Sequence, residues 1–195
     1  PTTALADGTY NLTLTATDDA GNVSPATSPF VLKVDTAIAA PTGGLDGSSD
    51  TGVPGDNKTA DTTPALSGTT EKGAAVEVTV NGVVYTTTAD AVTGIWTIPA
   101  TATLTNGTYT PSIKVTDLAG NTATANGTAF TVDATAPNTP VLSSVSDNVS
   151  GGVFNGNLNS GGATNDSTPT LTFTAEAGST VAVYDGASLL GNAVE

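Results

Sequence analysis

The side chains of this sequence that could do chemistry are almost all carboxylates. The 195 residues include 18 acidic and four basic side chains and no His or Cys, and the formal net charge is −14. Fourteen of the acids are Asp and four are Glu. Asp favours turns and short-reach oxygen ligation. The composition therefore excludes thiolate and imidazole chemistry and leaves two interpretations: turn-forming aspartates or a site for a hard cation.

One acidic loop occurs twice, which favours the second interpretation. TDDAGN at 17–22 returns as TDLAGN at 116–121, and the similarity extends back through DGTYNLTLTATDDAGN (7–22) and NGTYTPSIKVTDLAGN (106–121). FVLKVDTAIAAP (30–41) likewise resembles FTVDATAPNTP (130–140), and TADTTPALSGTTEKGAAVEV (59–78) resembles TNDSTPTLTFTAEAGSTVAV (164–183). These matches give a period of about 100 residues, the size of a β-sandwich module.

The elements that must position these acids are predicted to be strands. Thr, Val, Gly, Asn and Asp are abundant and Arg is absent, which favours an all-β fold of tandem immunoglobulin-like β-sandwich modules. We expect the closing part of one module at 1–35, a complete module at 36–135 that includes an acidic linker at 36–62, and the opening part of another at 136–195. Alternation predicts strands in the complete module at 63–69, 76–80, 83–88, 95–98, 108–116 and 128–133. The expected core consists of Trp96, Tyr109, Val78, Val80, Ile113 and Val115.

The segments 41–62 and 138–168 lack strand periodicity and are rich in Gly, Ser, Asn and Asp. They are typical of flexible linkers. Their acids are nevertheless regularly placed: Asp46, Asp50, Asp56 and Asp61 in the first segment, and Asp147 and Asp166 in the second. Phe154 is an aromatic side chain in the second segment, and it either closes the base of that loop or contacts a ligand.

Several carboxylates should converge where modules meet. In an immunoglobulin-like sandwich, the TDLAGN loop lies at the end where the chain enters. Asp117 should therefore face Asp35 and the acids of 46–61, and the turn at Asp7 should reach the same junction. Uncompensated, such acids repel one another. Ca²⁺ accepts six to eight oxygen ligands, and it fits better than Zn²⁺, copper or Mg²⁺.

Each of these acids also has a simpler interpretation, because Asp in DG, DN and TD dipeptides forms side-chain turns without any metal. Asp90 and Asp185 belong to mid-module hairpins and are expected to be plain turn residues. Glu71 and Glu176 are expected in the first hairpin of successive modules, at the end where the chain exits, and either role stays open for them.

The motifs VDTAIAAP, SDTGVPGDNKTADTTPALSGTTEKGA, GIWTIPA and DGTYNLTLTATDDAGN resemble the bacterial immunoglobulin-like repeats of large type I-secreted, calcium-binding, biofilm-associated adhesins. The resemblance implies Ca²⁺ at module junctions, where it stiffens a rod that presents an adhesive tip. The implied ligands at the first junction are Asp35, Asp50, Asp56, Asp61 and Asp117, with Asp7 and Asp18 in the neighbouring turns. Those at the second are Asp133, Asp147 and Asp166, where Asn replaces several Asp residues and the site is expected either to be weaker or to use amide oxygens.

These observations predict an extracellular spacer of a bacterial surface adhesin, secreted and without enzymatic activity. The alternative is an Ig-like module that binds glycans or proteins. A net charge of −14 disfavours nucleic acid as a partner, and neither a spanning segment nor a signal peptide is expected in this stretch. The expected partners are neighbouring repeats of the same chain, and the two partial modules could complete each other head to tail between chains. The ligand of the adhesin stays open.

Overall fold

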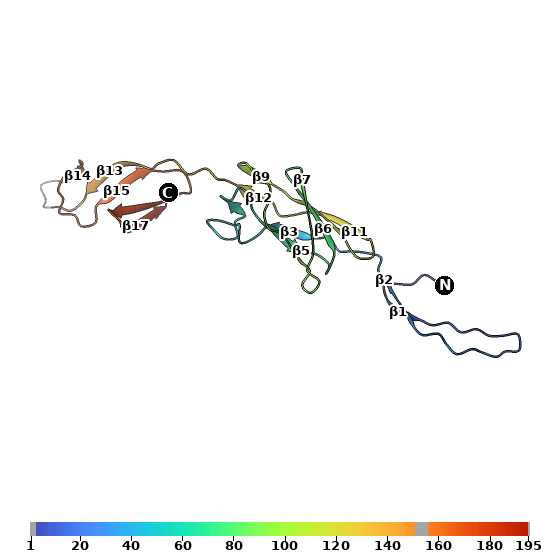
Figure 1. Ribbon diagram of the computed structural model, residues 1–195. Coiled ribbons are helices and arrows are strands. Elements are labelled where there is room, and N and C mark those ends of the chain that lie inside the picture. The colour runs from blue at the N-terminus through green and yellow to red at the C-terminus, as the bar shows by residue number, and fades with distance from the viewer. Residues whose placement is uncertain (1–2, 151–155, 195) are drawn as a thin grey trace. The chain divides into compact units, whose positions relative to one another are not determined.

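The computed structural model describes residues 3–150 and 156–194 (Figure 1). Phe154 lies outside the described residues. Within them every regular element is a β-strand, which confirms the prediction of an all-β chain, and no helix is long and apolar enough to cross a membrane. The chain forms two compact units, Pro1–Ala134 and Thr135–Glu195.

Twelve strands belong to the first unit. They are β1 (Gly8–Leu12), β2 (Phe30–Val34), β3 (Thr42–Leu45), β4 (Lys58–Thr59), β5 (Leu66–Thr69), β6 (Ala75–Val80), β7 (Val83–Thr88), β8 (Ile95–Ile98), β9 (Gly107–Tyr109), β10 (Ser112–Thr116), β11 (Thr122–Asn126) and β12 (Phe130–Val132). Residues 37–134 form a sandwich from a β11-β10-β6-β7 sheet, a β3-β5-β8 sheet and a small β4-β12-β9 sheet.

Alternation of side chains builds the core of this sandwich. In β6, Val76, Val78 and Val80 are buried while the residues between them are not, as expected of a strand with one buried face. They meet Trp96, Ile113, Val115 and Phe130 from the other strands. Of the predicted core residues, Tyr109 alone is only partly buried.

The hydroxyl of Tyr109 forms a hydrogen bond that keeps its ring at the edge of the core. Its hydroxyl donates to the carbonyl of Thr105 at 2.8 Å, and its ring lies 5.8 Å from that of Phe130. Tyr10 repeats the arrangement, because its hydroxyl donates to the carbonyl of Ala6 at 2.7 Å. Such a tyrosine corner is characteristic of immunoglobulin-like sandwiches.

The predicted linker at 41–62 was wrong in part, because it contains two strands. β3 pairs with β5 and β4 pairs in parallel with β12. Gly43 and Gly44 obscured β3, since glycine adds nothing to a hydrophobic pattern. Their presence has a packing reason: a Cβ on Gly43 would lie 2.3 Å from Cζ2 of Trp96. Strand β11, rich in Thr and Ala, was also missed.

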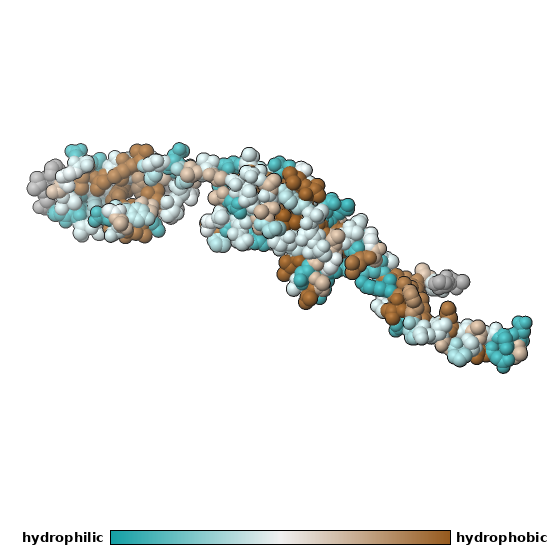
Figure 2. Space-filling view, in the orientation of Figure 1, coloured by the Kyte–Doolittle hydropathy of each residue, from teal (hydrophilic) through white to brown (hydrophobic). Residues whose placement is uncertain are grey.

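Residues 8–34 form a hairpin of β1 and β2. Beyond Leu12 it continues as a looser ladder in which Ser24 and Thr27 donate backbone N–H groups to the carbonyls of Ala16 and Leu14. Large apolar side chains, among them Leu14, Phe30 and Val31, are exposed on it, and brown surface marks its β1–β2 part in Figure 2. The hairpin therefore lacks the opposing sheet that covers the equivalent strands of the sandwich.

The described part of the second unit contains five strands: β13 (Val141–Asp147), β14 (Gly156–Leu158), β15 (Thr170–Thr174), β16 (Thr180–Asp185) and β17 (Ser188–Val194). They form a β14-β13-β15 sheet and a β16-β17 sheet. The predicted linker at 138–168 was thus also wrong in part, because β13 and β14 lie within it. Leu171, Phe173 and Val183 are only half-buried here, whereas Leu66 and Val78, the repeat equivalents of Leu171 and Val183, are fully buried.

Replacing Gly43 by Ala should lower the free energy of unfolding of the sandwich by about 1–3 kcal/mol, because the new methyl group overlaps the Trp96 ring and the Ser67 carbonyl. Gly47→Ala is the matched control, since no atom lies within 4 Å of the position its Cβ would take. Urea denaturation followed by Trp96 fluorescence measures both. Equal midpoints for the two variants would contradict this packing account of β3.

Candidate metal centre

Three carboxylates from distant parts of the sequence meet in the first unit. One oxygen from each of Asp35, Glu71 and Asp117 lies within 4.8 Å of the others; we name these residues the junction cluster. Asp35 follows β2, Glu71 lies in the turn between β5 and β6, and Asp117 follows β10. Asp117 is 7% exposed, and Asp35 and Glu71 are half-buried. The cluster joins the end of the first hairpin to two turns of the sandwich.

Asp117 is held in place by its own loop. Its Oδ1 accepts the backbone N–H groups of Ala119 and Asn121, both at 2.8 Å, and its Oδ2 accepts the Asn121 side-chain amide at 2.8 Å. The Asn121 amide, the largest influence, and these backbone donors hold the pKa of Asp117 below its ordinary value. The carboxylate is therefore ionised and cannot rotate freely away from its acidic neighbours.

The first copy of the loop has the same geometry. Oδ1 of Asp18 accepts the N–H groups of Ala20 at 3.0 Å and Asn22 at 2.8 Å, and its Oδ2 accepts the Asn22 amide at 2.8 Å. These bonds, with the Asn22 side chain first, lower the pKa of Asp18 as well. Since Asp18 is exposed and belongs to no acidic cluster among the described residues, the loop forms these hydrogen bonds without such a cluster.

What distinguishes the second copy is one further contact. The Asn121 amide also donates to the backbone carbonyl of Asp35 at 3.0 Å, across 86 residues of sequence. One side chain thus orients Asp117 and at the same time holds the segment that carries Asp35. The bond to the Asp35 carbonyl holds this segment without involving a charged group.

Lys33 forms the one ion pair with the cluster among the described residues. Its Nζ lies 2.9 Å from Oδ2 of Asp35, and this hydrogen bond, followed by the attraction of Asp35 and then of Glu71 and Asp117, raises the pKa of Lys33. The lysine side chain is 67% exposed, so this ion pair contributes little stability by itself. One positive charge facing three carboxylates leaves the cluster negative.

The donor set of the cluster suits Ca²⁺. All available ligand atoms are oxygens, from side chains that are buried or half-buried, and Ca²⁺ takes carboxylate oxygens in flexible geometry. Zn²⁺ and copper prefer nitrogen or sulfur ligands, and the sequence contains neither His nor Cys. Asp35, Glu71 and Asp117 are the residues that would hold the ion.

Asp7 was expected near this junction, and the structure places its Oδ1 2.7 Å from the hydroxyl of Thr36, which donates to it. Asp7 therefore holds the chain one residue beyond Asp35. In the complete module the equivalent residue is Asn106, whose amide donates to Oδ1 of Asp133 at 2.9 Å and whose carbonyl oxygen accepts the N–H of Ala134 at 3.0 Å.

The junction cluster does not include Asp50, Asp56 or Asp61. β3 explains why: Thr42 pairs with Thr69, close to Glu71 in sequence, and Leu45 pairs with Leu66 at the other end of the strand. Acids that follow β3 are therefore displaced along the sheet. Their segment lies beside the end of β12, where the backbone N–H of Asp133 donates to the carbonyl of Thr59 at 2.8 Å.

Most of these displaced acids accept local hydrogen bonds. Asp56 accepts the N–H of Lys58 at 2.9 Å, and Asp61 accepts the N–H of Thr63 at 2.8 Å and the Ser49 hydroxyl at 3.2 Å. Oδ2 of Asp50 accepts the N–H of Gly55 at 2.7 Å. Its Oδ1, however, is buried and has no hydrogen-bond donor within the described part of the chain. A buried carboxylate oxygen without a donor is costly unless a cation faces it.

Asp147 and Asp166, the two buried acids among the described residues of the second unit, both accept hydrogen bonds. Asp147 accepts the Thr164 hydroxyl at 2.6 Å and the N–H of Val149 at 2.8 Å. Asp166 accepts the N–H groups of Thr168 at 2.8 Å and Asn148 at 3.3 Å, and the Thr168 bond is the first cause of its lowered pKa. These bonds fold the segment between β13 and β15 onto itself. Metal binding by Asp133, Asp147 and Asp166 stays a prediction.

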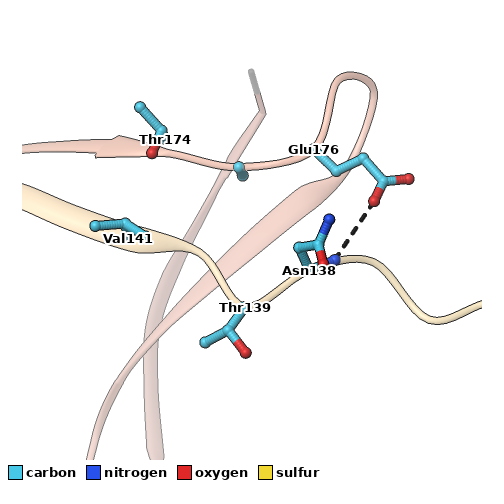
Figure 3. Close-up of a pocket in the computed structure, with 6 residues that line it drawn as sticks. Asn138, Thr139, Val141, Thr174 and Glu176 are labelled. Carbon is cyan, nitrogen blue, oxygen red and sulfur yellow. Dashed lines mark hydrogen bonds between the residues drawn. The ribbon is translucent and has the colours of Figure 1, made fainter.

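Glu71 was expected at the exit end, and this placement was wrong. Because β5 runs antiparallel to β3, the turn after Thr69 returns to the end of the sheet where the chain enters. Its repeat equivalent, Glu176, accepts the backbone N–H of Asn138 at 3.4 Å beside a surface hollow of about 270 Å³ (Figure 3). The position of EKGA directly after an expected strand was the feature of the sequence that could have placed Glu71 in this turn.

The comparison with protein families identifies the fold of this site. A model of the bacterial Ig-like domain matches residues 1–36 and 37–134. The chain belongs to the bacterial Ig-like domain family. This result confirms the family that the motifs indicated. No curated protein matches the chain, and the module limits at 35 and 135 stay predictions.

Three solved structures of adhesin segments are similar to this bacterial Ig-like chain, and it spans less than half of each. One is a Ca²⁺-stabilised adhesin that helps an Antarctic bacterium reach out and bind ice (26% identity, TM-score 0.34, 70% of this chain and 35% of that one). Another is a tetra-tandem repeat in the extending region of a large adhesion protein (22% identity, TM-score 0.44, 88% of this chain and 46% of that one). The third concerns host cell surface retention of a 1.5-MDa bacterial ice-binding adhesin (26% identity, TM-score 0.33, 64% of this chain and 41% of that one).

Asn121→Ala should release the first hairpin from the sandwich, because it removes both amide hydrogen bonds, to Asp117 and to Asp35. We expect a loss of about 1–2 kcal/mol in local stability, measured as faster hydrogen exchange at the backbone amide of Asn121 and its neighbours. Asn22→Ala is the matched control, since it removes only the bond to Asp18. Slowed or unchanged exchange in Asn121→Ala would contradict the double role of this amide.

Proposed function

We propose that this chain is a segment of the stalk of a bacterial surface adhesin, secreted to the outside of the cell, in which Ca²⁺ bound at module junctions stiffens a rod. The observation that supports the proposal is the junction cluster. It draws Asp35 from the end of one Ig-like segment and Glu71 and Asp117 from the next. A cation held by all three would tie the two segments together. Type I secretion and a role in biofilm formation belong to the same proposal.

The mechanism is electrostatic. Three carboxylates within 4.8 Å of one another repel, and Lys33 offsets only part of that repulsion. Without the divalent ion the hairpin is held chiefly by the Asn121 contact and is free to bend. With the ion, charge neutralisation adds to that contact and the angle between the segments is fixed. Asp50, with its unpartnered buried oxygen, is the residue we propose for a separate intramodule cation contact.

The proposed partners are neighbouring Ig-like repeats of the same chain. Between copies, we include the head-to-tail completion of the hairpin at 1–35 by the second unit. The stalk proposal and the completion proposal are separate, because the first depends on the junction cluster and the second on apolar strand faces.

Calcium should raise the melting temperature of the first unit and chelation should lower it. At a calcium concentration 100 times Kd, binding to the folded state stabilises by about 2.7 kcal/mol, which corresponds to a rise of roughly 10 °C for a module of this size. Glu71→Gln should remove most of that rise. Small-angle scattering should also show a shorter mean end-to-end length with chelator, because the uncompensated junction bends.

Glu77→Gln is the matched control, because Glu77 is also half-buried but faces Lys114 across β6 and β10. It should keep the full calcium response. Identical melting curves and scattering profiles with calcium and with chelator would sink the proposed stalk mechanism. A loss of response in both glutamate variants would place the ion elsewhere.

Lys33 should set the calcium affinity of the junction. Its ammonium group repels a divalent ion at the same carboxylates, so Lys33→Thr should strengthen calcium binding by about three- to tenfold at low salt. Thr is the residue at the equivalent place in the sandwich, since Thr131 pairs with Thr108 as Lys33 pairs with Thr9. Isothermal titration calorimetry measures the effect.

Lys114→Thr is the control for that titration. It removes the same charge from an exposed position on β10, away from the three carboxylates. Its calcium affinity should stay within about twofold of the parent chain, given screening at that range. Equal gains in both variants would mean that total charge, not the position of Lys33, governs binding.

A further inference from the structure

Asn-Gly dipeptides are places where a side chain of this protein can react with its own backbone. The backbone nitrogen of the glycine can attack the side-chain amide carbon of the asparagine, because a residue without a Cβ leaves that approach open. The sequence contains four such dipeptides, at 81–82, 106–107, 126–127 and 155–156. Asn155 lies outside the described residues, and the structure distinguishes the other three.

The side chain of Asn106 is held by two hydrogen bonds. Its amide nitrogen donates to Oδ1 of Asp133 at 2.9 Å, and its carbonyl oxygen accepts the N–H of Ala134 at 3.0 Å. Both ends of the amide group are therefore engaged, and the group cannot turn toward the following nitrogen until these bonds break. Each bond that must break first should slow the reaction by about tenfold.

At 126–127 the attacking nitrogen is engaged instead. Asn126 is exposed at the end of β11, but the N–H of Gly127 donates to the carbonyl of Pro111 at 2.8 Å. Gly127 is also tightly packed, since a Cβ at this position would lie 2.6 Å from the carbonyl oxygen of Gly43. This peptide therefore has little freedom to approach the Asn126 side chain.

Asn81 and Gly82 form the two-residue turn between β6 and β7. Val80 pairs with Val83 as the last pair of that ladder, and φ values of 49° and 77° place both turn residues in the left-handed region, as in a type I′ turn. Both residues are exposed. Because the two residues of such a turn lie outside the ladder, the nitrogen of Gly82 can react without breaking a β6–β7 hydrogen bond.

We infer that Asn81–Gly82 is a self-modification site, at which the sandwich loses ammonia without an enzyme. The nitrogen of Gly82 forms a bond to Cγ of Asn81, the Cγ–Nδ2 bond breaks, and Nδ2 leaves as ammonia with the proton that the Gly82 nitrogen gives up. Water then opens the succinimide ring at either carbonyl, which yields aspartate or isoaspartate. Water is the one co-reactant, so the inference is independent of the proposed stalk function and of calcium.

The two products affect the hairpin differently. Aspartate keeps the turn, because Asp-Gly suits a type I′ turn as Asn-Gly does, and the one added carboxylate changes the formal net charge from −14 to −15. Isoaspartate adds a methylene group to the backbone of a two-residue loop whose length fixes the strand register. Val80, beside the loop, is 2% exposed in the core, so this product should weaken the β6–β7 pairing.

Peptide mapping of the aged chain measures the reaction at each site. Chymotrypsin cuts after Tyr85 and Tyr109, which separates the peptides that contain Asn81, Asn106 and Asn126. After incubation in mildly alkaline buffer, mass spectrometry gives the converted fraction of each. Conversion of Asn81 should be at least about tenfold faster than that of Asn106 or Asn126. In urea the three rates should converge, because the fold no longer protects any of them.

The outcomes decide between the inference and its rivals. Faster or equal conversion of Asn106 or Asn126 in the folded chain overturns the choice of Asn81. An intact Asn81 in the folded chain, together with its conversion in urea, overturns the site itself. Conversion at the same rate with and without urea overturns the protection that the fold is inferred to give to Asn106 and Asn126.

A variant at Asp133 tests the cause of the protection. Asp133→Ala removes one of the two bonds that hold Asn106 and should raise its conversion by about tenfold, while Asp133→Asn keeps an acceptor oxygen and should raise it less. Conversion of Asn81 in the same samples is the internal control and should not change. If Asn106 reacts at the parent rate in Asp133→Ala, its hydrogen bonds are not what protects it.

A comparison of the two products tests the effect on the hairpin. Asn81→Asp carries the added charge without the added methylene group, and its urea midpoint should stay close to that of the parent chain. The isoaspartate form, isolated from aged protein by ion exchange, should unfold at a lower urea concentration. Equal midpoints for the two forms would overturn the inferred effect on the β6–β7 register.

Discussion

The repulsion among Asp35, Glu71 and Asp117 is the interaction on which the junction depends. The fold does not relieve it by letting the side chains turn away. Two backbone N–H groups and the Asn121 amide fix Asp117, and the same amide holds the backbone of Asp35. Asp117 and the backbone of Asp35 are therefore held in place before a cation enters, which lowers the cost of ordering these two ligands. This is how a cation could change the stiffness of a junction without refolding the modules on either side.

Two kinds of interaction stabilise different parts of this chain. Apolar burial around Trp96, Ile113 and Phe130 packs the sandwich at 37–134, whereas a polar contact of Asn121 holds the segment that precedes it. The comparison of Asp18 with Asp117 separates the two, because both loops form the same hydrogen bonds but only Asp117 belongs to a cluster of acids from distant segments. The loop motif is thus primarily structural. Its aspartate becomes a candidate metal ligand only where the preceding segment brings another carboxylate close to it.

Side-chain alternation and turn signals were sufficient to predict most strands of the complete module and its core, because Val, Ile and Trp at every second position leave few alternatives. They failed at β3, where Gly43 lies under the Trp96 ring and close packing takes the place of hydrophobicity. The approach of Asp117 to Asp35 followed from the topology of the fold. The positions of Glu71 and Asp50 did not, because each depends on the direction in which β3 runs, and that strand was absent from the prediction.

The two copies of the closing strands show where local sequence stops determining burial. Leu14 and Ile113 occupy the same place in the repeat and follow the same alternation, yet one is exposed and the other is fully buried. The tyrosine corner and the acidic loop form in both copies, since they need only neighbouring residues. Burial needs the opening strands as well. The cooperative unit is therefore the whole module of about 100 residues, in which the turns form locally and burial requires all of the strands.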